Sequence, residues 1–277
     1  MRLLAEKLSM SMDEKFVIEN RPSAGGIVAS QAALAAPHDG YTLLLAATGN
    51  FSMAPSLFKT LSFDPADDFE MISLMGTFGY ALAVSDSSSY RTVQDFIDAA
   101  KAQPGKLSIG TVSVGSGQYL SAELFKSATG IDAVTIPYKN SGSVVSALRA
   151  GDVQAAFETL TPLMSNIQAG TLRALAVTEG QRFQGLPEVP TMMESGVPDY
   201  KVEVWNAIAA AAGTPKGIID QLNKEVAQAL ALPDVQERFL SLGITARSST
   251  PAEMNAFLRR DIDMWREIIQ QSNVPIQ

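Results

Sequence analysis

Few side chains in this sequence could perform catalysis near neutral pH. His38 is the single histidine and stands in a Pro-His-Asp-Gly segment, which is typical of an exposed turn. A Ser-His-Asp triad would depend on this residue, and no Gly-x-Ser-x-Gly segment supplies the serine. The absence of cysteine excludes thiol catalysis, disulfides and thiolate metal sites. We therefore expect no catalytic residue.

Motifs for metal and nucleotide binding are incomplete as well. A zinc site with one histidine and no cysteine would need three carboxylates. Gly115 and Gly117 resemble the start of the dinucleotide fingerprint, but Leu120 stands where that motif has a third small residue. Asp67 and Asp68 are adjacent carboxylates in a polar segment, where water would solvate them. We expect no metal and no cofactor, and the sequence favours a binding protein over an enzyme.

Small polar residues follow several apolar, strand-like runs and precede helix-like segments. The runs end near Ala47, Val112, Pro137 and Phe157. In an open parallel sheet such segments gather at the carboxyl ends of the strands, where ligands bind. Helix N-termini present unpaired N–H groups, and glycines let an anion approach the backbone, so a carboxylate can be held without Arg or Lys. For one segment alone an ordinary helix cap is the commoner explanation, but together they favour a binding cleft.

Two larger side chains near these segments each allow two interpretations. Trp205 is either a core residue, which is the default for tryptophan, or an aromatic wall of the cleft. Glu158 follows a buried strand and is either a cap-region carboxylate or a charge that senses the ligand. If Glu158 faces the ligand, it would favour an ammonium group and repel a second carboxylate.

The elements that position these residues alternate between strand-like runs and helical patterns. This alternation predicts an α/β fold with a largely parallel sheet. The strand candidates are residues 16–19, 41–47, 82–84, 107–110, 133–136, 153–157 and 172–177. The C-terminal part is helical: Thr214-Pro215 and Thr250-Pro251 are each typical of an N-cap followed by proline. Apolar residues spaced three and four apart from Met254 to Ile269 predict one buried helix face.

The bulk composition limits the partners. The formal net charge of -8 disfavours nucleic acid, because phosphate binding depends on clustered Lys and Arg. No apolar run reaches the roughly 20 residues that a membrane-spanning helix needs. The length of 277 residues allows two domains, yet no linker-like segment divides the chain, which suggests two lobes joined by continuous strands.

Segments along the whole chain match one known pattern in a consistent order. They are residues 17–26, 37–44, 115–116, 122–125, 137–139, 170–178, 186–191 and 212–215. In these segments the sequence resembles the tripartite tricarboxylate transporter receptors, the Bug family of solute-binding proteins. The resemblance implies a periplasmic-binding-protein type II fold, in which two α/β lobes close on a ligand. Lobe one would comprise residues 1–106 and 206–277 and lobe two residues 107–205, with a two-strand hinge near residues 107–111 and 204–207.

The resemblance also implies the ligand and the residues that hold it. Family ligands are mostly small carboxylates (di- or tricarboxylates, amino acids or aromatic acids) held by backbone groups, hydroxyls and waters. Carried onto matching positions, the ligand-binding residues are Thr48, Gly49, Asn50, Phe51, Ser113, Val114, Gly115, Ser116, Gly117, Gln118, Tyr138, Asn140, Ser141, Glu158, Thr159 and Trp205. Gln118 stands where the family often has histidine, which could alter the choice of ligand.

The implied role is a periplasmic, monomeric receptor that delivers its ligand to the membrane permease subunits of the transporter. The alternative is a ligand-sensing module of a signalling system that uses the same fold. Family members usually begin with a signal peptide, a first strand and a Pro-Phe-x-x-Gly-Gly loop, whereas this sequence starts inside the helix that follows them. We therefore expect the first strand and one ligand loop of lobe one to be missing from it, through truncation or a misassigned start rather than natural loss.

Overall fold

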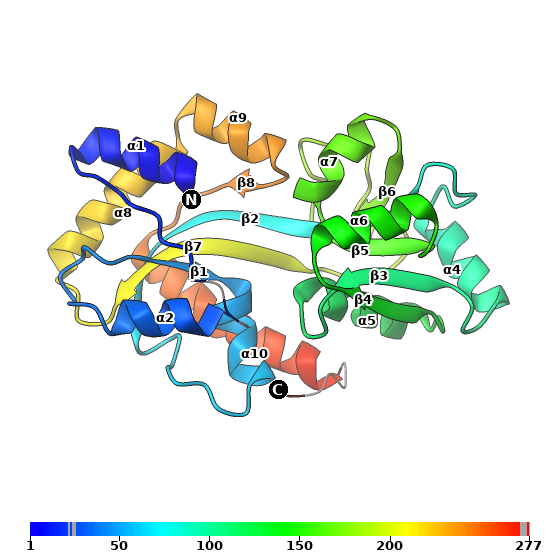
Figure 1. Ribbon diagram of the computed structural model, residues 1–277, viewed down its shortest axis with the longest axis horizontal. Helices are drawn as coiled ribbons and strands as arrows, with labels where there is room; N and C mark the ends of the chain where they lie inside the picture. Colours follow the sequence, from blue (N-terminus) through cyan, green and yellow to red (C-terminus); the bar gives the residue numbers. More distant parts are fainter. Residues whose placement is uncertain (22, 24–25, 272–275, 277) are drawn as a thin grey trace. The chain divides into compact units, whose positions relative to one another are not determined.

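The computed structural model describes residues 1–21, 23, 26–271 and 276, and these residues form two compact units (Figure 1). Unit 1 comprises residues 1–77, 205–239 and 245–277, and unit 2 comprises residues 78–204 and 240–244. The chain leaves unit 1 inside strand β2 (Phe69–Ser85) and returns to it inside strand β7 (Glu203–Ala211). This division differs from the expected lobes mainly at the first boundary. Residues 78–106 belong to unit 2 because β2 is one long strand whose second half pairs with unit 2 strands.

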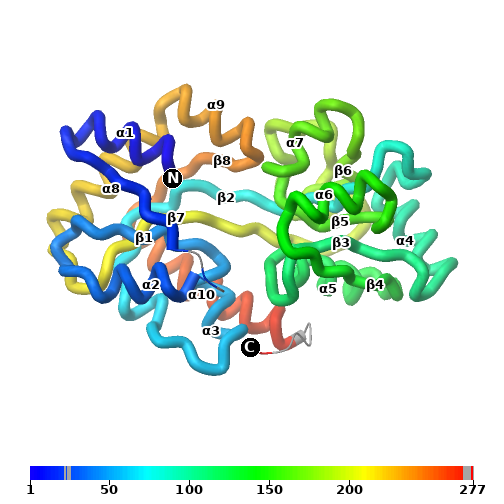
Figure 2. The backbone as a smooth tube through the Cα atoms, viewed as in Figure 1, coloured from blue at the N-terminus to red at the C-terminus, as the bar shows by residue number. Residues whose placement is uncertain are grey.

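Unit 1 combines a small antiparallel sheet with helices. Its elements are α1 (Arg2–Met12), α2 (Ile27–Leu34), β1 (Leu44–Ala47), the π-helix η2 (Thr48–Met53), α3 (Ala54–Leu57), α8 (Lys216–Leu230), α9 (Pro233–Ser241, whose end enters unit 2), β8 (Thr245–Ala246) and α10 (Pro251–Gln271). Strand β1 runs antiparallel to β7, and β8 runs antiparallel to the first half of β2. The blue helix α1 packs against α8 (Figure 2).

The last helix, α10, packs its apolar face on the core of unit 1. Met254, Leu258 and Ile262 join the same buried cluster as the rings of Phe51 and Phe69. Thr250 caps this helix, since its hydroxyl accepts from the Glu253 N–H at 3.2 Å and its own N–H donates to the Glu253 carboxylate at 2.8 Å. The predicted cap and the predicted buried face are both confirmed.

Unit 2 contains the parallel part of the sheet. Its elements are α4 (Val93–Ala102), β3 (Ser108–Val112), α5 (Gly117–Thr129), β4 (Val134–Tyr138), α6 (Ser141–Ala150), β5 (Ala155–Thr159), α7 (Leu160–Gln168) and β6 (Leu172–Val177). Strand β3 pairs in parallel with both β4 and β5, and the second half of β2 pairs antiparallel with β5 and β6. The prediction of a largely parallel sheet is therefore correct for β3, β4 and β5 only, because β2 runs against its neighbours.

Most strand predictions match the structure, and one is wrong. The predicted strand at residues 172–177 is β6 with the same bounds, and residues 82–84 are the end of the longer β2. Residues 16–19 were predicted as a strand but form no regular structure. Val17 is 75% exposed, so the apolar run that suggested a strand is not buried. The glycine-bearing segment that follows includes Pro22, Ala24 and Gly25, which lie outside the described residues.

No helix within the described ranges is both long and apolar enough to cross a membrane.

Candidate functional site

The predicted ligand-binding residues fall into two groups, one within each unit. The larger group belongs to unit 2 and stands at the carboxyl ends of β3, β4 and β5. The register of the β3–β4 ladder places Val112 opposite Tyr138, so the segments that follow both strands leave the sheet side by side. A helix begins after each strand, and three helix N-termini therefore gather at one edge of this sheet.

The segment between β3 and α5 is a tight turn that ends in a helix cap. The Ser116 N–H donates to the Ser113 carbonyl at 3.0 Å, and Gly115 between them has a φ of 80°, a left-handed conformation that favours glycine. The Ser116 hydroxyl accepts from the Tyr119 N–H at 3.2 Å. Ser113 and Val114 are exposed. An ordinary helix cap, one of the two explanations that the sequence allowed, is therefore present here, and the exposed residues Ser113 and Val114 precede it.

The segment between β4 and α6 is built in the same way. Asn140 caps α6, with its Oδ1 accepting from the Ser143 N–H at 3.0 Å. Ser141 is the first residue of the helix and is half-buried. Burial, assisted by the charge of Asp152, raises the pKa of Tyr138, so this phenol stays protonated and can donate a hydrogen bond at neutral pH.

Glu158 links the end of β5 to the start of α5. Its side chain is 0% exposed, and its Oε1 accepts from the Gln118 Nε2 at 2.9 Å and from the Thr159 N–H at 2.7 Å. The Thr159 hydroxyl donates to the same oxygen at 3.2 Å. The Oε2 of Glu158 is buried and has no hydrogen-bond partner among the described residues. The structure thus brings Gln118, Glu158 and Thr159 together, and their contact with a ligand stays a prediction.

Tyr80 of β2 is a neighbour of this group that the sequence did not indicate. Its ring is buried and its hydroxyl lies against Gly117, where an added Cβ would come within 1.9 Å of the hydroxyl oxygen. Burial and, to a smaller extent, the Glu158 carboxylate raise the pKa of Tyr80. Thr178 positions this residue, since its Oγ1 accepts from the Tyr80 N–H at 2.8 Å. The sequence signal for this contact was Gly117, because a residue without a side chain is needed where the Tyr80 hydroxyl approaches the backbone.

The smaller group lies in unit 1, directly after β1. Thr48 is buried and its hydroxyl accepts from the Trp205 N–H at 2.8 Å. Asn50 is also buried, and its Oδ1 accepts from the Ala47 N–H at 2.8 Å. Gly49 is exposed, with open space where a side chain would be. In this group the side chains of Thr48 and Asn50 hold the backbone, and Gly49 is the open position.

Two predicted side chains in unit 1 belong to its core. Phe51 is completely buried, and its ring centroid lies 5.0 Å from that of Phe69. Trp205 is 1% exposed, and its indole N–H donates to the Asp261 carboxylate at 2.7 Å. For Trp205 the structure favours the core over the aromatic wall of a cleft.

Glu179 is a second buried acid of unit 2 and lies against Gly79 of β2. Burial, and next the charge of Glu203, raise the pKa of Glu179 to about 7. An added Cβ on Gly79 would lie 2.6 Å from the Glu179 Oε2, so this carboxyl packs directly on the backbone of β2. The same Oε2 has no hydrogen-bond partner in the described chain.

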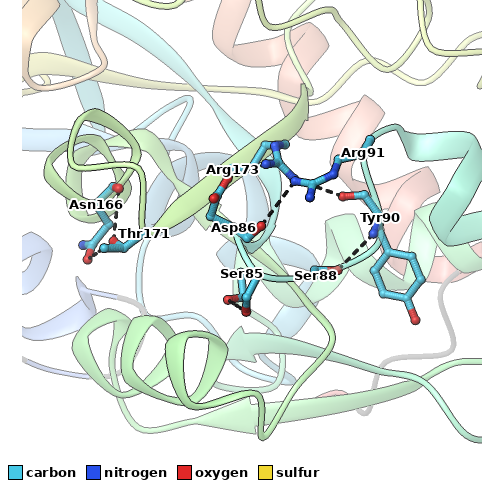
Figure 3. Close-up of polar contacts among 9 residues, drawn as sticks. Ser85, Asp86, Ser88, Tyr90, Arg91, Asn166, Thr171 and Arg173 are labelled. Carbon is cyan, nitrogen blue, oxygen red and sulfur yellow. Dashed lines mark hydrogen bonds and ion pairs between the residues drawn. The ribbon is translucent and has the colours of Figure 1, made fainter.

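An ion pair of unit 2 lies at the C-terminal end of β2 and has a structural role. Figure 3 shows Arg173 of β6 paired with Asp86, and the Arg173 guanidinium also donates to the Tyr90 carbonyl at 3.4 Å. Ser85, next to Asp86, pairs with Leu172 at the start of β6, whereas Tyr80 pairs with Thr159 at the end of β5. Arg173 therefore fixes the turn after β2 and is remote from the predicted ligand-binding residues of unit 2.

Catalytic and metal-binding constellations are not evident in the described part of the chain. His38 is exposed, and its ring nitrogen lies 3.4 Å from the Leu34 carbonyl, as expected for a turn residue. No group of three or more His, Cys, Asp or Glu side chains among the described residues could hold a metal ion.

Comparison with known proteins identifies the family. The model of the tripartite tricarboxylate transporter family receptor matches residues 1–274. The chain belongs to this family. Similar solved structures include a periplasmic binding protein named BugD, which is 30% identical with a TM-score of 0.86 and is matched over 100% of this chain and 93% of its own. The expected type II periplasmic-binding fold is thereby confirmed.

Two further structures of similar proteins contain carboxylates. Rpa4515 of R. palustris, solved with adipate, is 31% identical with a TM-score of 0.89, over 99% of this chain and 92% of its own. MatC of Rhodopseudomonas palustris, solved with malate, is 25% identical with a TM-score of 0.83, over 97% of this chain and 92% of its own. The family consists of solute receptors, and these comparisons support a carboxylate-binding receptor.

Proposed function

We propose that this protein captures a small carboxylate and delivers it to a tripartite tricarboxylate-type membrane transporter. The observation that carries the proposal is the gathering of the α5, α6 and α7 N-termini at one edge of the unit 2 sheet. The first turns of these helices present N–H groups that lack intrahelical partners, together with a partial positive charge. Such an edge can hold a carboxylate without a basic side chain.

The proposed ligand contacts are the predicted residues. In unit 2 they are Ser113, Val114, Gly115, Ser116, Gly117, Gln118, Tyr138, Asn140, Ser141, Glu158 and Thr159, and Tyr80 joins them as a hydrogen-bond donor. In unit 1 the proposed contacts are Thr48, Gly49, Asn50 and the backbone of Phe51 and Trp205. The proposed ligand class is a di- or tricarboxylate, amino acid or aromatic acid, and the dicarboxylates adipate and malate in the structures of Rpa4515 and MatC support its dicarboxylate members.

The partners and compartment follow from the same proposal. We place the protein in the periplasm as a monomer, where the membrane permease subunits of the transporter would be its transient partners. BugD, a periplasmic binding protein of similar structure, supports this compartment. No catalytic step is part of the proposed role.

A thermal-shift screen tests the ligand class. A ligand present at about 100 times its Kd adds about 2.7 kcal/mol to the free energy of unfolding, which raises the melting temperature by about 5 °C or more. The panel consists of dicarboxylates, tricarboxylates, amino acids and aromatic acids. We expect at least one of these acids to raise the melting temperature, and no response to any of them would refute the proposal.

A pair of variants then tests the location. Gln118→Ala removes a predicted ligand contact at the start of α5, whereas Gln94→Ala removes an exposed glutamine from α4 of the same unit. The ligand-induced shift should fall in the first variant and persist in the second. Equal shifts in both variants would place the ligand elsewhere.

A further inference from the structure

Glu158 is a buried carboxyl group that forms no ion pair with a cation among the described residues. It is 0% exposed, and the ion pairs of the described residues in unit 2 involve other acids. Its Oε1 accepts three hydrogen bonds while its buried Oε2 accepts none. Buried charges are ordinarily paired, so an unpaired one needs an explanation.

The hydrogen bond between Gln118 and Glu158 fixes the orientation of the Gln118 amide. An ionised carboxylate can only accept hydrogen bonds, so the amide nitrogen of Gln118 must face it. The carbonyl oxygen of Gln118 therefore points away from Glu158. Gln118 is the second residue of α5, after the cap Ser116, and is half-buried. Glu158 is therefore a positioning residue: it turns the Gln118 amide so that its carbonyl oxygen adds a hydrogen-bond acceptor to the first turn of α5.

We propose that the Gln118–Glu158 pair makes this receptor selective for carboxylates that carry an amino group over the same acids without one. This inference rests on the proposed function and narrows its ligand class. The helix N-termini would hold the carboxylate of the ligand, and the Gln118 carbonyl would accept from its ammonium group. The uncompensated charge of Glu158 attracts the ammonium and repels a second carboxylate, and its effect is strong because little water screens a buried charge.

Matched acids that differ in one substituent test the selectivity. Isothermal titration calorimetry near neutral pH would give the Kd of succinate, L-malate and L-aspartate, and of adipate and L-2-aminoadipate. We expect the amino acid of at least one series to bind the wild-type protein about tenfold or more tightly than the unsubstituted acid. L-malate should resemble succinate, because a hydroxyl group donates a hydrogen bond without balancing the charge.

Glu158→Gln removes the charge while keeping the size of the side chain. It should reduce the preference for the amino acid about tenfold, by weakening its binding and leaving or improving that of the unsubstituted acid. Glu188→Gln is the matched control, since Glu188 is an exposed acid of the same unit, and it should leave the preference unchanged. If Glu158→Gln does not fold, Gln118→Met on the half-buried position replaces it and should also reduce the preference.

The outcomes separate this inference from the proposed function. A wild-type protein that binds these acids without preferring the amino form overturns the inference and leaves the proposed function standing. An unchanged preference in Glu158→Gln, or in Gln118→Met where that variant replaces it, also overturns it. Failure of every carboxylate to bind the wild-type protein contradicts the proposed function itself.

Discussion

Glu179 should make the stability of this protein depend on pH. In the folded state its pKa is raised from 4.5 to about 7, first by burial and then by the charge of Glu203. The unfolded chain releases the proton at a lower pH than the folded protein does, so this group destabilises the folded state increasingly as the pH rises from 4.5 to about 7. Below that window the side chain is neutral in both states and contributes no penalty.

The magnitude follows from the two pKa values. At about 1.4 kcal/mol for each pKa unit, the penalty above the window is on the order of 3 kcal/mol. Glu179→Gln replaces the carboxyl with a neutral group of the same size, which can still accept the backbone hydrogen bonds near Gly79. The variant should therefore be more stable than the wild type at about pH 8, by on the order of 2–3 kcal/mol, and nearly equal to it at about pH 4.5.

Urea unfolding followed by circular dichroism across this pH range measures the difference. Glu188→Gln, which removes an exposed acid from the same unit, controls for the change in net charge and should show little pH dependence. A Glu179→Gln protein that is no more stable than the wild type at about pH 8 would refute the reasoning. A gain in stability of equal size at both ends of the range would also refute it, because it could not come from the titration of Glu179.

Three substitutions test the packing that holds the candidate site. Gly117→Ala should weaken ligand binding and cost about 1–3 kcal/mol of stability, because its Cβ would meet the Tyr80 hydroxyl at 1.9 Å. Adding Tyr80→Phe removes that hydroxyl and should restore part of the ligand binding and part of the stability. A double variant that recovers neither would argue against this contact. Trp205→Phe should cost about 2–3 kcal/mol in urea unfolding, since it removes the buried indole donor to Asp261; a cost near zero would contradict the core role. Thr250→Ala should lower stability by about 1 kcal/mol through loss of the α10 cap, and Thr250→Ser should retain most of it.

The sequence predicted those parts of the fold that depend on local chemistry. Thr250-Pro251 predicts a helix cap, because a short polar side chain before proline can accept from a backbone N–H group a few residues ahead, and Thr250 does cap α10. The face of α10 was recognised from its spacing of three and four residues. Both features depend only on residues that are close together in the sequence, within one turn of a helix or along one helix.

Features that depend on contacts between distant parts of the chain were harder to predict. The start of β2 at Phe69 was missed, because this strand is buried on both faces and shows no alternation of apolar and polar residues. Tyr80 was missed because its contact with Gly117 joins residues far apart in the sequence. The apolar residues at positions 16–19 suggested a strand, but this segment forms no strand and its Val17 is exposed.

We propose that backbone N–H groups at the edge of the unit 2 sheet hold a small carboxylate. Nitrogen-15 NMR of the protein, titrated with the acid that gives the largest thermal shift, tests this claim directly. We predict saturable shifts of the amide signals of Ser116, Gly117, Gln118 and Thr159, with one Kd common to all of them. Saturable binding that leaves these four signals unmoved would contradict the claim.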